Sequence, residues 1–180
     1  MDKIVSQKIV ECLRANDFFN DAARAHRIWL QHVEKTLPKG PRGGLPPRVR
    51  DARQLNQRID ILGPEAAFDE LISNLLYYAE RWLHMTDPDV VAERPYLRYV
   101  CACLPDSRLS HGEKHGLIFP ASHSFWTLWY PPNGLGCMCT VMSVSESLLQ
   151  RRRWNVSRTA AFKFPLPDEG FRFNVGLLSS

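Results

Sequence analysis

Two histidines and two cysteines are the residues of this sequence best suited to metal chemistry. His111 and His115 are four positions apart, so on a helical turn both imidazoles project from the same side. Cys137 and Cys139 lie two apart in an apolar run, and in a strand both thiols point to one face. Imidazole and thiolate ligands in these numbers suit a tetrahedral, structural zinc ion. These four residues are therefore the candidate metal ligands.

The Cys-x-Cys spacing has a purely structural explanation as well. Chelating turns more often use Cys-x-x-Cys, whereas alternation in a strand places two small residues of a Cys-x-Cys in the core. Cysteine is among the most frequently buried residue types. Cys101 and Cys103 repeat the spacing upstream, so a group of four cysteines on two packed strands is a further alternative. The spacing leaves zinc binding and core packing both open.

Catalysis in this region lacks the sequence context that it requires. His111-Gly-Glu113 followed by two cysteines shares elements with the zinc deaminase signature, but the cysteine pair lacks one spacer residue and the preceding proline. The chain has no Gly-x-Ser-x-Gly nucleophile motif. The glycines at 43–44 lack the strand and helix of a phosphate-binding loop. We therefore expect no enzymatic activity.

A stiff turn leads into the second cysteine pair, in 130-YPPNGLGCMCTV-141. Pro131 and Pro132 fix φ, and Asn133 and Gly134 can adopt positive φ. This combination predicts a sharp corner, and the aromatic residues before it, including Trp126, are placed to pack over it.

The segment 106-DSRLSHGEKHGLIF-119 must position the histidines. Asp106 and Arg108 carry opposite charges two residues apart, and we expect them to pair and hold the loop that carries His111. The loop would then close over the Pro-Pro-Asn-Gly corner, with Trp126 filling the gap. In this interpretation the polar residues stabilise the fold, with or without an ion.

The elements predicted around these residues are helices first and short strands afterwards. Apolar periodicity predicts helices over 3–35, with a break near Asn16, and over 64–84; Asp87 and Pro88 begin a short helix over 87–93. β-branched and aromatic residues predict strands over 95–104 and 137–144. Ser143-Val-Ser-Glu146 fits a capping box for a helix to about Arg152. This order predicts an α+β fold: N-terminal helices, then a small sheet of short strands with long ordered loops.

Composition divides the chain into three parts. We expect a helical N-terminal arm over 1–37, a basic linker rich in Pro and Gly over 38–60, and the main domain over 61–180. The net charge is only +4, but basic residues concentrate in the linker, where they are candidates for DNA contact. These residues are Lys39, Arg42, Arg48, Arg50 and Arg53. No apolar run reaches the length of a membrane span, and we expect no membrane partner and reduced thiols.

The order of these motifs resembles the phage Mu F-like minor head proteins, also called phage head morphogenesis domains. The resemblance covers roughly 60–176 and rests on RPYLRYV, the Asp-x-Arg and histidine loop, SFW, YPPNG, Cys-x-Cys and the closing DEGFRFNVG. The positions that it marks are Asp106, Arg108, His111, Gly116, Trp126, Pro131, Pro132, Asn133, Gly134, Cys137 and Cys139.

The resemblance implies a minor structural protein of a tailed phage or prophage head. Its role would be head morphogenesis at the portal and the packaging or delivery of DNA. The expected partners are the portal, other head proteins and viral DNA, and the expected location is the virion head and, during assembly, the bacterial cytoplasm. The alternative is a metal-dependent nuclease or toxin-type enzyme that uses the His111 and Cys137 region.

Overall fold

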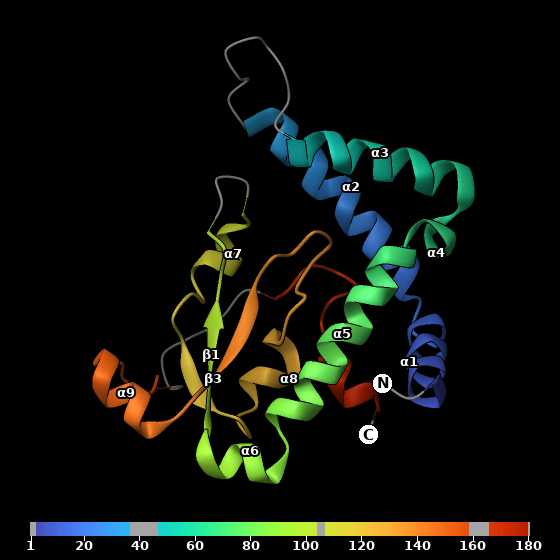
Figure 1. Cartoon of the computed structure of the whole chain (residues 1–180). Helices are drawn as coiled ribbons and strands as arrows, with labels where there is room; N and C mark the ends of the chain where they lie inside the picture. The colour runs from blue at the N-terminus through green and yellow to red at the C-terminus, as the bar shows by residue number, and fades with distance from the viewer. Residues whose placement is uncertain (1–2, 37–46, 104–106, 159–165, 180) are drawn as a thin grey trace.

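The computed structural model describes residues 3–36, 47–103, 107–158 and 166–179, and it confirms the α+β class (Figure 1). The first part is helical: α1 Lys3–Ala15, α2 Phe18–Thr36, α3 Pro47–Leu62, α4 Pro64–Ala67, α5 Asp69–Met85 and α6 Pro88–Glu93. Short elements follow: β1 Tyr96–Val100, α7 Leu109–Gly112, β2 Ile118–Pro120, α8 Phe125–Trp129, β3 Thr140–Val144, α9 Glu146–Arg152 and the 3-10 helix η2 Val175–Ser179. No described helix is both long and apolar enough to cross a membrane.

Local sequence signals set several of the helix boundaries. The predicted break near Asn16 is present: Asp17 has a φ of 54°, and the Asn16 amide donates to the Cys12 carbonyl at 2.8 Å. Asp87 caps α6 by accepting from the Asp89 N–H at 2.9 Å, as predicted.

The cap of α9 differs from the prediction. The side chain of Ser145, and not that of Ser143, accepts from the Leu148 N–H, at 3.2 Å. Ser143 lies inside β3, where it pairs with Leu97 of β1. Both serines fit the spacing of a cap, and the end of the strand decides between them.

The prediction of a linker over 38–60 is wrong for its second half, because residues 47–62 form helix α3. All the prolines and glycines of this stretch lie at or before Pro47, a residue that suits the first turn of a helix. Helix α3 runs back beside α2 in Figure 1, and Leu30, Val49 and Ala52 form a small core between them. We call this pair the α2–α3 hairpin.

The sheet has the order β2-β1-β3 and both pairings are antiparallel. Leu97 pairs with Phe119 of β2 and Ser143 of β3. The two predicted strands are present in shortened form, and β2 was missed because three residues carry little pattern. One face of β1 is buried, whereas Arg98 on the other face lies under the Trp154 ring, 4.3 Å from its centroid.

One hydrophobic cluster joins the N-terminal helices to the rest of the fold. It includes Ile9, Phe18, Leu75, Trp126 and Phe171, none more than 2% exposed. In Figure 1, α5 and α8 lie on one side of the sheet and η2 lies beside α5 and α1. The segment expected to be a separate arm therefore packs into the same core as the predicted main domain.

Candidate functional site

Three of the four candidate metal ligands meet in the interior. One ligand atom from each of His111, Cys137 and Cys139 lies within 4.8 Å of the other two. The Nδ1 atom of His111 is 3.5 Å from the Cys137 sulfur and 3.7 Å from the Cys139 sulfur. The exposed fractions of these residues are only 2%, 8% and 3%. The geometry brings an imidazole and two thiols together without contact to bulk water.

Backbone bonds hold the histidine loop against the sheet. The His111 N–H donates to the Arg108 carbonyl at 3.0 Å and closes the single turn of α7. Gly116 then takes a φ of 87°, which favours glycine, and its N–H donates to the Tyr99 carbonyl at 2.9 Å. On the opposite side, the Tyr78 hydroxyl donates to the Cys139 carbonyl at 2.7 Å.

His115, the fourth candidate ligand, is not part of this group. The four-residue spacing requires a continuous helix, but α7 ends at Gly112. His115 is exposed, and its Nδ1 atom accepts from the Cys101 N–H at 3.1 Å.

The two thiols of the group have opposite pKa shifts. A hydrogen bond from the Cys139 thiol lowers the pKa of Cys137, against the effect of burial, and His111 lowers it further. The pKa of Cys139 is raised, chiefly because its thiol donates the hydrogen bond to Cys137 and also because it is buried. Cys137 therefore loses its proton more readily than Cys139.

Arg108 pairs with Asp168 of the closing segment. Its Nε atom lies 2.6 Å from Oδ2 of Asp168, and its Nη2 atom donates to the Leu135 carbonyl at 3.2 Å. The guanidinium also lies over the Trp29 ring of α2, 5.0 Å from the centroid. Burial raises the pKa of the Asp168 carboxyl, and Arg108 opposes that shift. The expected partner, Asp106, lies outside the described residues.

Asn133 connects the corner to the sheet and to the closing segment. Its side-chain amide donates to the Tyr99 hydroxyl at 2.9 Å and to the Trp129 carbonyl at 3.4 Å. Its backbone carbonyl accepts from the Asp168 N–H at 3.1 Å. Asn133 is fully buried, and these bonds give its amide nitrogen and backbone carbonyl polar partners, whereas no described residue donates to its Oδ1 atom.

The corner requires glycine for a reason other than the expected positive φ. Neither Asn133 nor Gly134 has positive φ, whereas Gly136 does, at 69°. A Cβ on Gly134 would clash with the Asp168 carboxyl and lie 3.0 Å from the Arg108 guanidinium carbon. The preceding Pro131–Pro132 bond is cis, and both prolines are buried. Close packing against the ion pair excludes a side chain at position 134.

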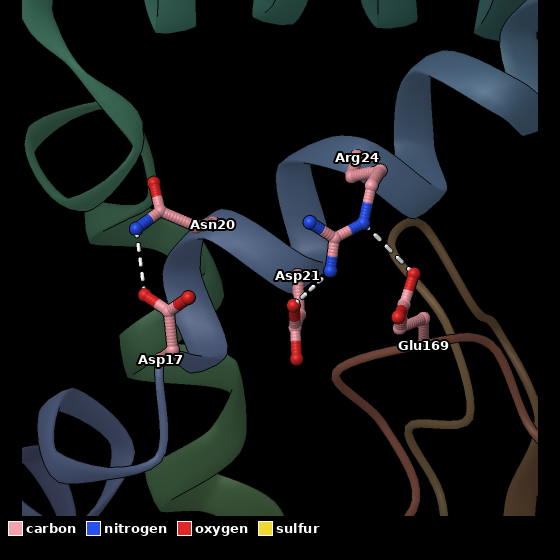
Figure 2. Close-up of polar contacts among 5 residues, drawn as sticks. All are labelled: Asp17, Asn20, Asp21, Arg24 and Glu169. Carbon is pink, nitrogen blue, oxygen red and sulfur yellow. Dashed lines mark hydrogen bonds and ion pairs between the residues drawn. The ribbon is translucent and has the colours of Figure 1, made fainter.

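The closing segment attaches this site to α2, as Figure 2 shows. Glu169 accepts from Arg24 at 2.9 Å, and Arg24 also pairs with Asp21. Gly170 has a φ of 83°, and a Cβ there would lie 2.8 Å from the Ala22 backbone nitrogen. The residues after Asp168 therefore bind the chain to the first turns of α2.

Trp129, and not Trp126, is the tryptophan beside the histidine loop. Its ring centroid lies 6.0 Å from that of His111 in an edge-on arrangement. Trp126 is buried elsewhere, and its indole N–H donates to the Pro120 carbonyl of β2 at 3.0 Å. The expectation that Trp126 fills the gap at the corner is therefore wrong.

Lys114 is a buried cation that the sequence did not reveal. Its side chain is 0% exposed, and Nζ lies 4.5 Å from the centroid of the Trp129 ring and 3.3 Å from a Glu113 carboxylate oxygen. Burial lowers the pKa of Lys114, and Glu113 opposes that shift. Its position between Glu113 and His115 suggests an exposed loop, so no local signal predicts its burial.

The basic residues expected to contact DNA are only partly described. They are Lys39, Arg42, Arg48, Arg50 and Arg53, of which the first two lie outside the described residues and the third belongs to α3. Arg50 is exposed on α3. Arg53 donates to Glu34 of α2 at 2.5 Å, which offsets its charge. Of the two described side chains in this set, Arg50 lies at the surface and Arg53 is paired with Glu34.

We call the buried set described above the polar corner. It consists of Tyr99, Arg108, His111, Asn133, Cys137, Cys139 and Asp168. Tyr99 and Asp168 were not expected there: Tyr99 belongs to the alternating pattern of β1, and Asp168 opens the closing DEGFRFNVG segment. Those two patterns are the signals through which they could have been found.

Part of the chain is similar in sequence to proteins named as phage or prophage F proteins. It is 38% identical over 81 residues to the protein named Mu-like prophage FluMu F protein, from Haemophilus influenzae. It is 34% identical over 68 residues to the putative capsid assembly protein F of Escherichia phage Mu. The matches cover 45% and 38% of this chain, but only 19% and 16% of those relatives. No protein-family model and no solved structure matches the chain.

Proposed function

We propose that this chain, which is similar over part of its length to the Mu F-like head proteins, is a structural component of a tailed phage or prophage head. The observation that carries the proposal is the sequence identity to a protein named as a capsid assembly protein. The match is partial, so the proposal concerns the role of this chain and not every activity of its longer relatives.

The polar corner supports a structural role over catalysis. Its polar groups bind one another: the Arg108 side chain pairs with Asp168, and Asn133 bonds Tyr99. His111 is only 2% exposed, whereas a catalytic histidine must reach a substrate. Glu113, which a metal-dependent nuclease would need beside it, is 62% exposed and bonds Lys114. Among the described residues, His111 therefore does not line an open cleft of the kind that the enzyme alternative requires.

The finer role that we propose is assembly at the portal, with DNA as a second partner. The α2–α3 hairpin extends away from the sheet in Figure 1 and carries the exposed Arg50. A basic, projecting helix pair is suited to contact an acidic protein ring or a phosphate backbone.

Co-expression with the neighbouring head genes tests the assembly role. We expect the protein to co-sediment with assembled heads and to be captured by a tagged portal protein. Deletion of its gene should reduce the yield of mature heads. Normal heads that form without it and do not contain it would contradict the proposal, and a His111→Ala variant that folds but loses nuclease activity would favour the enzyme.

A titration with short duplex DNA tests the second partner. Neutralised phosphates release counterions, so affinity should fall steeply with salt. The double variant Arg50→Ala and Arg53→Ala should weaken binding, whereas Arg151→Ala with Arg152→Ala, on the exposed end of α9, is the matched control. Equal affinity of both variants and the parent would exclude this helix as the contact.

A further inference from the structure

The two nitrogen–sulfur distances in the His111, Cys137 and Cys139 group match those of a zinc site. A tetrahedral zinc ion with Zn–S of about 2.3 Å and Zn–N of about 2.0–2.1 Å sets its nitrogen and sulfur ligands about 3.6 Å apart. The observed separations from His111 Nδ1 are 3.5 Å to Cys137 and 3.7 Å to Cys139. Both observed nitrogen–sulfur distances agree with the value expected around one shared zinc ion to within about 0.1 Å.

Hydrogen bonding alone accounts less well for this arrangement. An imidazole Nδ1 carries either one hydrogen or one lone pair in the ring plane, so it makes one directed bond. Here two sulfurs lie at nearly equal distances from the same nitrogen. An ion between the three atoms satisfies all of them together.

We propose that His111, Cys137 and Cys139 bind a zinc ion that fastens the histidine loop to the strand after the corner. All three residues are buried, which suits a structural site and not a catalytic one. The chain order also fits, because the ion would join two segments that are separated by β2 and α8.

Two neighbouring residues interact electrostatically with the site. Asp168 interacts with both His111 and Cys137, while no described residue accepts a hydrogen bond from His111 Nε2. Cys101, buried at the end of β1, influences Cys139 in the same way. The fourth ligand that we propose is Cys101 or solvent; in this structure the Cys101 sulfur lies outside the group of three.

Metal analysis of the full chain, purified under reducing conditions without added metal, is the first test. We expect about one zinc ion per chain, and X-ray absorption should show Zn–S distances of about 2.3 Å with at least two sulfurs. A third sulfur would identify Cys101 as the fourth ligand. Protein that contains no zinc and takes up none would overturn the proposal.

Matched variants separate binding from folding. Cys137→Ser and Cys139→Ser should lose zinc, whereas Cys103→Ser, an exposed thiol, and His115→Ala, an exposed histidine, should retain it. If the ligand variants do not fold, cobalt(II) added to the metal-free parent is the second readout, and it should produce a thiolate charge-transfer band. Absence of that band, or its retention in a folded variant that carries both Cys137→Ser and Cys139→Ser, would contradict the site.

Zinc should also stabilise the native chain. At a free zinc concentration of about one hundred times Kd, we expect the thermal midpoint to rise by about 5–10 °C relative to protein treated with chelator. Magnesium, which prefers oxygen ligands, is the control and should not restore the midpoint. The head-assembly role does not depend on this result, because loss of zinc binding and loss of portal capture are separate measurements.

Discussion

The polar corner and the α2–α3 hairpin are held in opposite ways. In the corner, the pair Arg108–Asp168 is only 12% and 20% exposed, and the amide of Asn133 is fully buried. In the hairpin, the pairs Arg27–Asp60 and Arg53–Glu34 lie at the surface, above a core of three small or aliphatic residues. Buried polar bonds are costly to break, whereas exposed pairs add little.

This difference indicates where the molecule tolerates change. The corner connects the histidine loop, the sheet and the closing segment, so one substitution affects three parts of the fold. The hairpin is attached through Phe18, Ala22 and Ile59, which belong to the main core. Two further contacts are Trp29, which lies against Arg108, and Arg24, which bonds Glu169. A surface that must adapt to partners is better placed on the hairpin than on the corner.

Arg108→Ala should give the largest loss of stability. It leaves the Asp168 carboxyl buried without its cation, and breaking a buried pair typically costs about 3–5 kcal/mol. Urea denaturation of the variant and the parent measures the difference. A loss below about 1 kcal/mol, the range of exposed pairs, would remove the distinction between the two regions.

Asn133→Ala should be the next most damaging change. It leaves the buried Tyr99 hydroxyl without its amide partner, which costs about 1–3 kcal/mol. Tyr99→Phe and the double variant complete a cycle that isolates this bond. Additive losses in the cycle would show that the two residues stabilise the fold independently.

His26 should give a smaller, pH-dependent effect on the hairpin. Its Nε2 atom lies 3.2 Å from the Ala52 carbonyl, and burial lowers its pKa, with Arg108 and Arg27 adding to the shift. The unfolded chain, with a histidine pKa of about 6.5, therefore binds the proton at a higher pH than the folded chain. Stability should fall as pH drops below about 6.5.

The control for this effect is His26→Gln, which keeps a hydrogen-bond donor but cannot titrate. Unfolding free energies measured between pH 7.5 and 5 should slope less steeply in this variant, by about the contribution of one proton. Parallel curves for the parent and the variant would mean that His26 does not contribute to the pH dependence.

Arg27→Ala should have the smallest effect. The pair Arg27–Asp60 joins α2 to α3 with side chains 48% and 65% exposed, and such pairs contribute at most about 1 kcal/mol. The same denaturation measurement applies, repeated in high salt, which should erase most of the difference. A loss comparable to that of Arg108→Ala would show that the hairpin is held as tightly as the corner.

The structural features that could be predicted from the sequence are those with a local signal. The break at Asn16–Asp17, the Asp87 cap and the α+β order of elements follow from bonds within a turn or from one period of apolar residues. The Pro and Gly residues that predicted the linker over 38–60 are a local signal too. That prediction is wrong from Pro47 onward, where helix α3 begins.

The contacts between residues far apart in the chain could be identified from the tertiary structure alone. Asp168 became the partner of Arg108, Gly134 was required by the space that this pair occupies, and His115 was left outside the group that His111 joins. Residue types do not encode these choices locally, because each depends on where packing places segments far apart in the chain. The physical reason is that burial removes water as a partner, so the polar side chains of the corner must bind whichever groups the fold brings to them.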